Sequence, residues 1–194
     1  MFPFLAIFIT FCLVLTYYIR KSDASQQKVE DEFWEKERLA NTVRKQDISK
    51  LDYITIPFEK IPQKLGTLTE KNLFALADKP MLNLTGISNT DLKLQYGTAN
   101  INILSEYDSN FIEFISLLPA YADELIEAGY EDTAVMLLEF AIECNADSRK
   151  IYNQLITYYL SSQQPEKIDM LRQACEHLPE LTKKAVQKDL SAIN

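Results

Sequence analysis

The sequence predicts a mostly α-helical protein in which an N-terminal transmembrane helix precedes a stack of helical hairpins. Three observations support this fold class. The first nineteen residues carry no charge. Four glycines and seven prolines among 194 residues are too few for the turns of a large β-sandwich or barrel. Apolar residues in the C-terminal half recur at helical spacing.

Residues 1–19 form the expected transmembrane anchor. As a helix rising about 1.5 Å per residue, they span roughly 28 Å, close to the ~30 Å of a hydrocarbon core. The alternative is a cleaved secretory signal, but no Lys or Arg precedes this run and the run is long for a signal. Arg20 and Lys21 follow directly, so the positive-inside rule predicts a single-pass protein of the cell membrane with a cytoplasmic C-terminal domain. The lipid bilayer is therefore the first expected partner.

Residues 20–49 are expected to contain a juxtamembrane amphipathic helix. A polar connector over 21–27 comes first, and Val29, Phe33 and Ala40 then recur at helical spacing among many charged residues. Residues 50–88 follow as an extended strap with one short helix.

The strap is predicted from Pro57 and Pro62, which interrupt any helix. Its short helix is expected over 70–77, with Thr69 as the capping residue. Asn83, Leu84 and Thr85 form a glycosylation acceptor only if this side of the membrane is lumenal, which the orientation above disfavours.

Gly86 and Gly97 make the next segment unusual, and two interpretations remain open. The segment is either a ligand loop or a turn at Gly86, a helix N-cap at Asn89 or Thr90, and a close approach of a neighbour at Gly97. It lacks both the P-loop spacing and the GxGxxG fingerprint, so the second interpretation is favoured.

Residues 89–194 are expected to form a helical-repeat domain, because the pattern of apolar residues recurs further along the chain. Seven apolar residues of the first unit each have an apolar counterpart at the same sequence separation as that between Leu118 and Tyr152. The seven pairs are Leu118/Tyr152, Tyr121/Leu155, Ala122/Ile156, Leu125/Tyr159, Ala134/Ile168, Leu137/Leu171 and Ala141/Cys175. The expected helices are one ending before Tyr107, then 110–128, 132–144, 148–161, 165–176 and 179–192, the last being a polar cap.

The segment YADELIEAGYEDTAVMLLEFAIE resembles a tetratricopeptide repeat (TPR). Ala122, Ala134 and Ala141 fall on the three small packing positions of that family, and Gly129 lies at its interhelical turn. The resemblance covers residues 114–178 and implies an α-solenoid. The whole chain also resembles uncharacterised bacterial single-pass membrane proteins with a TPR-like C-terminal domain. The residues expected to pack between helices are Tyr121, Ala122, Leu125, Ala134, Ala141, Tyr152, Leu155 and Tyr159.

In the second unit, bulkier residues replace the small ones. Ile156 and Ile168 stand at two of the small positions, and Gln163 stands where the first unit has its turn glycine. Because large side chains push helices apart, this stack is expected to be irregular.

The middle of the chain is strongly acidic. Between Lys93 and Arg149 there is no Lys or Arg, while eleven acidic residues occur from Glu106 to Asp147. Such a surface disfavours nucleic acid and suits a protein or basic peptide partner; a merely solvated face is the competing interpretation. The candidate partner-binding acids are Glu113, Asp123, Glu124, Glu127 and Glu131.

The sequence offers no conventional catalytic set. It has one histidine and no CxxC pair, and Cys175 and His177 diverge on a helix, so neither cofactor nor metal is expected. The predicted function is a non-catalytic membrane-tethered protein-interaction module or scaffold. The alternative is a membrane-associated enzyme, or enzyme subunit, that uses acidic residues in a pocket beside Gly86 and Gly97.

Overall fold

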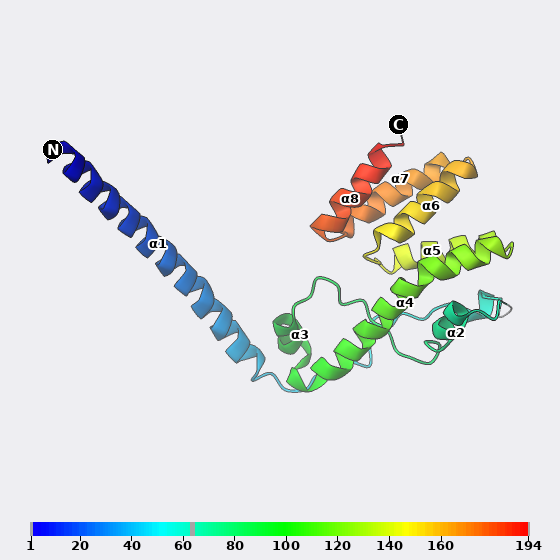
Figure 1. The fold of residues 1–194 in the computed structure, drawn as a ribbon. Helices are drawn as coiled ribbons and strands as arrows, with labels where there is room; N and C mark the ends of the chain where they lie inside the picture. The colour runs from blue at the N-terminus through cyan, green and yellow to red at the C-terminus, as the bar shows by residue number, and fades with distance from the viewer. Residues whose placement is uncertain (1, 63–64, 194) are drawn as a thin grey trace. The chain divides into compact units, whose positions relative to one another are not determined.

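The structure is a computed structural model that describes residues 2–62 and 65–193, and every regular element in these residues is helical (Figure 1). The α-helices and short 3-10 (η) helices are α1 (Phe2–Ala40), η1 (Phe58–Lys60), α2 (Leu68–Phe74), α3 (Asn89–Tyr96), η2 (Thr98–Asn100), α4 (Ile101–Glu127), α5 (Glu131–Glu143), α6 (Arg149–Ser161), α7 (Pro165–Ala174), η3 (Cys175–His177) and α8 (Glu180–Ser191). They form two compact units. Met1–Asp47 and Ser88–Ile101 belong to the first, and Ile48–Ile87 and Asn102–Asn194 to the second.

Helix α1 is long and apolar enough to span a membrane. Its large apolar side chains from Phe4 to Ile19 are 47–79% exposed. The sequence placed a polar connector over 21–27 between the apolar segment and a separate amphipathic helix, but α1 continues through that connector to Ala40. The segment holds no glycine or proline, so nothing in its backbone chemistry ends the helix.

In the first unit, α3 packs against the end of α1 through paired charges. Glu37 accepts a hydrogen bond from Thr90 Oγ1 at 2.7 Å and forms an ion pair with Lys93. Lys36 Nζ lies 2.6 Å from Asp91. The hydrogen bonds from Lys93 and Thr90 hold the pKa of Glu37 below its ordinary value.

Both ends of α3 are fixed by local chemistry. Its N-cap is Ser88 rather than Asn89 or Thr90, since Ser88 has the extended conformation of a cap and its hydroxyl accepts from Asp91 N. Gly97 ends the helix with φ +82°, and a Cβ there would lie 2.4 Å from the carbonyl oxygen of Arg44. The predicted close approach at Gly97 is therefore confirmed.

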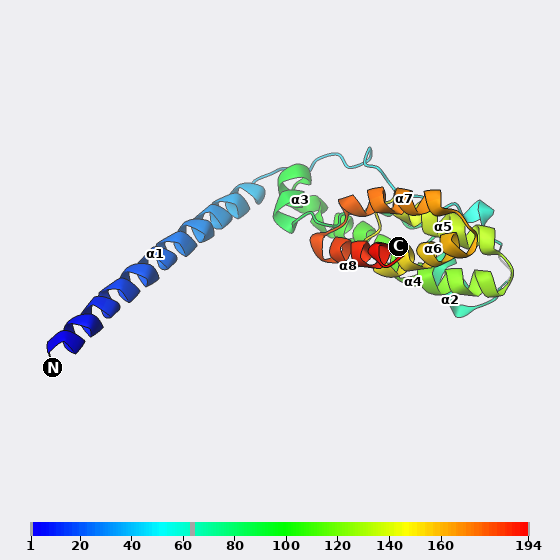
Figure 2. The same ribbon diagram turned by 90° about the horizontal axis from the view of Figure 1, so that it is seen from above.

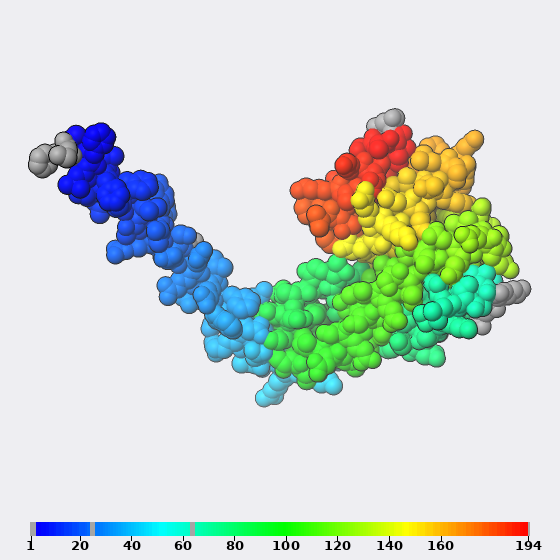
Figure 3. Space-filling view, in the orientation of Figure 1, coloured from blue at the N-terminus to red at the C-terminus, as the bar shows by residue number. Residues whose placement is uncertain are grey.

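In the second unit, the strap over Ile48–Ile87 supplies part of the hydrophobic core. Its buried apolar side chains join those of α4 in one cluster. In the space-filling view, the cyan part of the strap lies against the green of α4 (Figure 3). The strap residues of that cluster are Ile56, Ile61, Leu73, Leu76 and Met81.

Helix α2 begins earlier than the sequence suggests, at Leu68 with Thr67 as its N-cap, so the assignment of Thr69 was wrong. Thr67 Oγ1 accepts from Glu70 N at 3.1 Å, and Glu70 in return accepts from Gly66 N at 2.7 Å. This is a reciprocal capping arrangement, which explains why a carboxylate as buried as Glu70 is tolerated.

Helix α4 is one continuous helix of 27 residues, so the expected break before Asn110 was wrong. Residues 101–110 contain neither glycine nor proline. Pro119 lies inside α4 and removes one backbone donor. Its own carbonyl accepts from Gln154 Nε2 of α6 at 2.8 Å.

Helices α4 to α7 contain two hairpins with equivalent turns. Both members of all seven apolar pairs are buried. After α4, Gly129 has φ +83° and Tyr130 N donates to Leu125 O at 2.8 Å. After α6, Gln163 has φ +57° and Gln164 N donates to Tyr159 O at 2.9 Å. The residue with positive φ and the hydrogen bond that closes the turn therefore recur in the second hairpin with the same sequence separation as the seven apolar pairs.

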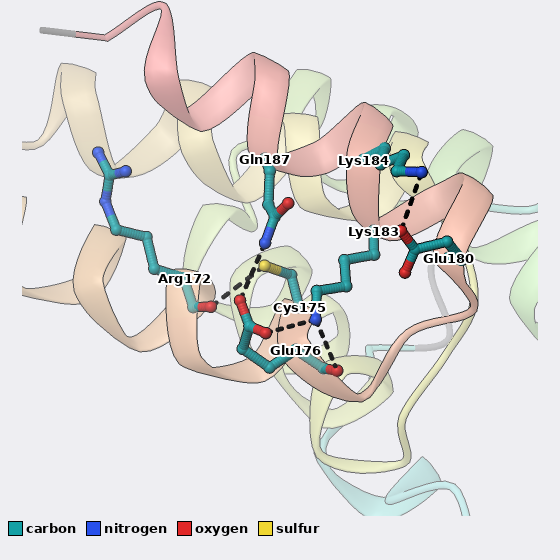
Figure 4. Close-up of polar contacts among 7 residues, drawn as sticks. All are labelled: Arg172, Cys175, Glu176, Glu180, Lys183, Lys184 and Gln187. Atoms are coloured by element: carbon teal, nitrogen blue, oxygen red, sulfur yellow. Dashed lines mark hydrogen bonds and ion pairs between the residues drawn. The ribbon is translucent and has the colours of Figure 1, made fainter.

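Helix α6 is central to this part of the unit, because it contacts α5, α7 and α8 (Figure 2). Arg149 at its start forms two hydrogen bonds, of 2.6 and 2.7 Å, with the carboxylate of Asp189 in α8. Two polar side chains of α8 turn back onto η3 (Figure 4): Lys183 Nζ lies 2.5 Å from Glu176 Oε2, and Gln187 donates to Glu176 Oε1 at 2.9 Å. Helix α8 therefore packs on both α6 and η3. Its exposed side chains include charged ones such as Lys184 but also Leu181, which is 85% exposed.

Candidate functional site: a hollow between α4 and α6

The eight residues expected to pack between helices all lie in the core of the second unit. Each is at most 2% exposed. Burial is the main cause that raises the pKa of Tyr121, Tyr152 and Tyr159 above the ordinary value. At Tyr121, the negative charges of Glu70 and Glu124 raise the pKa further.

The five candidate acids do not form one patch. Glu113 is exposed, 3.9 Å from Lys79 Nζ of the strap. Glu127 and Glu131 are exposed at the end of α4 and the start of α5. Asp123 and Glu124 are sequence neighbours that point to different parts of the fold.

Glu124 is a structural residue of the strap. It is half-buried, and its two carboxylate oxygens accept hydrogen bonds from Thr67 Oγ1 and Thr69 Oγ1, each at 2.7 Å. Bonds to an ionised acceptor are stronger than those between neutral groups. Glu124 therefore attaches the start of α2 to α4.

Asp123 faces α6, where it borders a hollow of about 370 Å³. Gln154 Nε2 of α6 donates to Asp123 Oδ1 at 2.7 Å. We call this feature the α4–α6 hollow and define it by Asp123, Ile126, Glu131, Lys150, Gln154 and Tyr158. The structure thus places Asp123 and Glu131 at the same hollow. The sequence had shown only that both belong to the same acidic stretch of the chain.

The α4–α6 hollow combines two kinds of surface. Ile126 of α4 and Tyr158 of α6 supply apolar surface, while Asp123 and Glu131 supply negative charge. Lys150, at the start of α6, adds one positive charge. Ionised carboxylates beside apolar surface suit a ligand with a cationic head and an aliphatic stem.

A cluster of three polar side chains, Glu139, Tyr159 and Lys167, joins three helices. The sequence analysis did not predict it. Glu139 of α5 accepts from Tyr159 Oη of α6 at 2.7 Å and from Lys167 Nζ of α7 at 2.5 Å. Burial opposes the ionisation of Glu139, but these two hydrogen bonds hold its pKa below the ordinary value. The residues are 20 and 28 positions apart in sequence, so no local pattern signals the contact.

The glycines proposed to border an enzymatic pocket have backbone roles. Gly86 belongs to the second unit and is exposed in a turn with φ +82°, while Gly97 belongs to the first unit and ends α3. Within residues 2–62 and 65–193, no cluster of three or more His, Cys, Asp or Glu side chains is placed to hold a metal ion. Buried Cys175 donates to Arg172 O at 3.1 Å, and burial raises its pKa.

No protein-family model, curated protein or solved structure matches this chain. The structural class of this protein therefore follows from its fold alone. Over the described residues it is a mostly helical protein with one N-terminal helix that is long and apolar enough to cross a membrane.

Proposed function

We propose that this chain is a single-pass protein of the cell membrane whose helical hairpins, a TPR-like stack in the cytoplasm, hold a protein partner near the bilayer without catalysis. The observation that carries the proposal is the exposed apolar surface of α1, 47–79% at its large side chains from Phe4 to Ile19. Such a surface is stable when lipid surrounds it.

The repeat-like architecture is supported by the two turns. Gly129 and Gln163 have the same left-handed backbone conformation, and the hydrogen bonds that close their turns occupy equivalent positions in the two hairpins. Stacked hairpins of this kind bury apolar faces that a single hairpin leaves exposed. They also leave concave surfaces between neighbouring helices, and the α4–α6 hollow is such a surface.

The orientation is supported by Arg20 and Lys21, which follow the apolar segment directly. Basic residues next to a membrane span favour the cytoplasmic side. Single cysteines placed at the exposed Thr85 and Glu143 would test this, in a background without the natural cysteines. In intact cells, a membrane-impermeant maleimide should label neither position until the membrane is permeabilised.

The interaction role is tested by in-cell crosslinking and purification of the full chain from detergent-solubilised membranes. We expect a specific protein partner that is recovered with the full chain and lost when residues 102–194 are replaced by an unrelated soluble domain. Equal recovery with the replaced domain, or no partner with either protein, would contradict the proposal.

A further inference from the structure

We infer that the α4–α6 hollow binds one basic side chain, an arginine or a lysine, of a partner polypeptide. This inference rests on the proposed function and names the chemistry by which the partner is recognised. The size of the hollow, the surfaces that line it and the charge around it each support the assignment.

The hollow has the dimensions and walls that a long basic side chain requires. Its volume of about 370 Å³ is within the range of small ligand sites. Ile126, 37% exposed, and Tyr158 face it from neighbouring helices. Arginine and lysine bury their methylene stems along such apolar surface while the charged head contacts acceptors.

The acceptors are already positioned. Gln154 is hydrogen-bonded both to Pro119 O and to Asp123 Oδ1, which fixes the orientation of the Asp123 carboxylate against α6. Glu131, from the first turn of α5, adds a second carboxylate at the same hollow.

The surrounding charge selects a cationic occupant. The stretch between Lys93 and Arg149 has eleven acidic residues and no Lys or Arg, and the whole chain has a net charge of −8. A second copy of this chain or an anionic lipid surface would be repelled by this field, whereas a basic segment is attracted to it. Lys150 opposes the occupant, so the effect of removing it has the opposite sign to the effect of removing Glu131.

The test uses the full chain in nanodiscs of neutral phosphatidylcholine, with a fluorescein-labelled peptide of alternating arginine and serine as the probe. A matched peptide with glutamine in place of arginine, and empty nanodiscs, serve as binding controls. We expect fluorescence anisotropy to show binding of the arginine peptide. Glu131→Gln should weaken that binding about two- to fivefold, as for other exposed ion pairs, and Lys150→Ala should strengthen it.

Glu143→Gln is the matched control variant, because it makes the same change in net charge on the same helix. Glu143 lies twelve residues from Glu131, about 18 Å along the helix axis, which exceeds the Debye length of ~8 Å at physiological ionic strength. It should therefore leave peptide binding unchanged. Circular dichroism melts of each variant separate lost binding from lost folding.

Equal weakening by Glu131→Gln and Glu143→Gln would show attraction by net charge alone and would overturn the site. Weaker or unchanged binding in Lys150→Ala would also overturn it. If crosslinking still recovers a specific partner in either case, the proposed function stands and this assignment of the hollow fails.

Discussion

At the scale of single residues, two different residue types adopt the same left-handed backbone conformation in the two interhelical turns. Gly129 adopts φ +83° without steric cost, whereas Gln163 adopts φ +57° with a Cβ that clashes in the left-handed region. Gln163 is thus strained, whereas glycine, the residue suited to this conformation, occupies the equivalent position in the first hairpin.

Replacing Gln163 with glycine should therefore stabilise the fold. We expect Gln163→Gly to raise the free energy of unfolding by ~0.5 kcal/mol, because relief of the left-handed strain exceeds the added entropy of the unfolded chain. Gly129→Ala should lower it by ~1 kcal/mol. Urea titration of the full chain in nanodiscs, followed by circular dichroism, measures both.

The control for this pair is Gln164→Gly. Gln164 has φ −113°, so glycine there adds flexibility without relieving strain and should be destabilising. Equal stabilisation by Gln163→Gly and Gln164→Gly would show that the left-handed turn is not the cause.

Glu124 and Glu127 form a natural matched pair on α4, one turn apart. Glu124→Gln weakens the bonds from Thr67 and Thr69 and should lower the free energy of unfolding by about 1–2 kcal/mol. Glu127→Gln, at an exposed position, should change it by less than ~0.5 kcal/mol. Hydrogen exchange should accelerate at residues 67–76 in Glu124→Gln only, and unchanged exchange there would mean that Glu124 does not attach the strap.

At the scale of secondary-structure elements, side chains from distant segments hold the strap and the hairpins in place. Asn110 Nδ2 donates to Pro80 O at 2.9 Å, and Asn83 Nδ2 donates to Cys144 O at 2.8 Å. The Asn83 amide is thus engaged with the carbonyl groups at the end of α5. Carbonyl groups at a helix end require such partners, which gives Asn83 a structural role in place of the glycosylation considered from sequence.

The contact of Glu139 with Lys167 and Tyr159 should make the packing of α5, α6 and α7 sensitive to acid. The folded pKa of Glu139 lies below its ordinary value, so its contribution to stability is complete above the unfolded pKa of ~4.3. That contribution is lost as the pH falls through the lower folded pKa.

Glu139→Gln should therefore be less stable than the wild-type chain at pH 7 and should lose less stability on acidification. Thermal unfolding between pH 7 and pH 3, followed by circular dichroism, tests this, with exposed Glu143→Gln as the control on the same helix. Parallel pH curves for the wild-type and Glu139→Gln chains would contradict the assignment.

At the scale of the whole molecule, the proposed tethering of the hairpins to the membrane requires that the apolar segment of α1 is retained. If the apolar segment is retained, peptide mapping or intact-mass analysis of the purified chain should detect residues 2–19. The chain should also remain in membranes after alkaline carbonate extraction, and deletion of residues 2–19 should release it. A mature terminus beyond Ile19 would identify a cleaved signal and contradict the tethering proposal.

Much of the architecture could be predicted because it depends on local patterns. The uncharged run before Arg20 sets a long apolar helix, and the constant offset between apolar pairs identifies residues that are all buried. The placement of Gly97 against the backbone was also predictable, since a glycine between helical segments indicates either a turn or a close contact.

The site was less predictable, because adjacent residues on a helix face different neighbours. Asp123 and Glu124 are about 100° apart around α4, so one borders the α4–α6 hollow while the other binds the strap. No pattern in the sequence states which neighbour will lie on which side.

By itself, the sequence determined the helical content, the apolar N-terminal helix and the buried faces of the hairpins, since these follow from composition and the helical period. Tertiary structure alone decided that Asp123 and Glu131 share a hollow, that Glu124 is engaged by the strap, and that Glu139 meets Lys167. Such contacts depend on how packed helices are positioned, and this position is set by the fit of all buried side chains together.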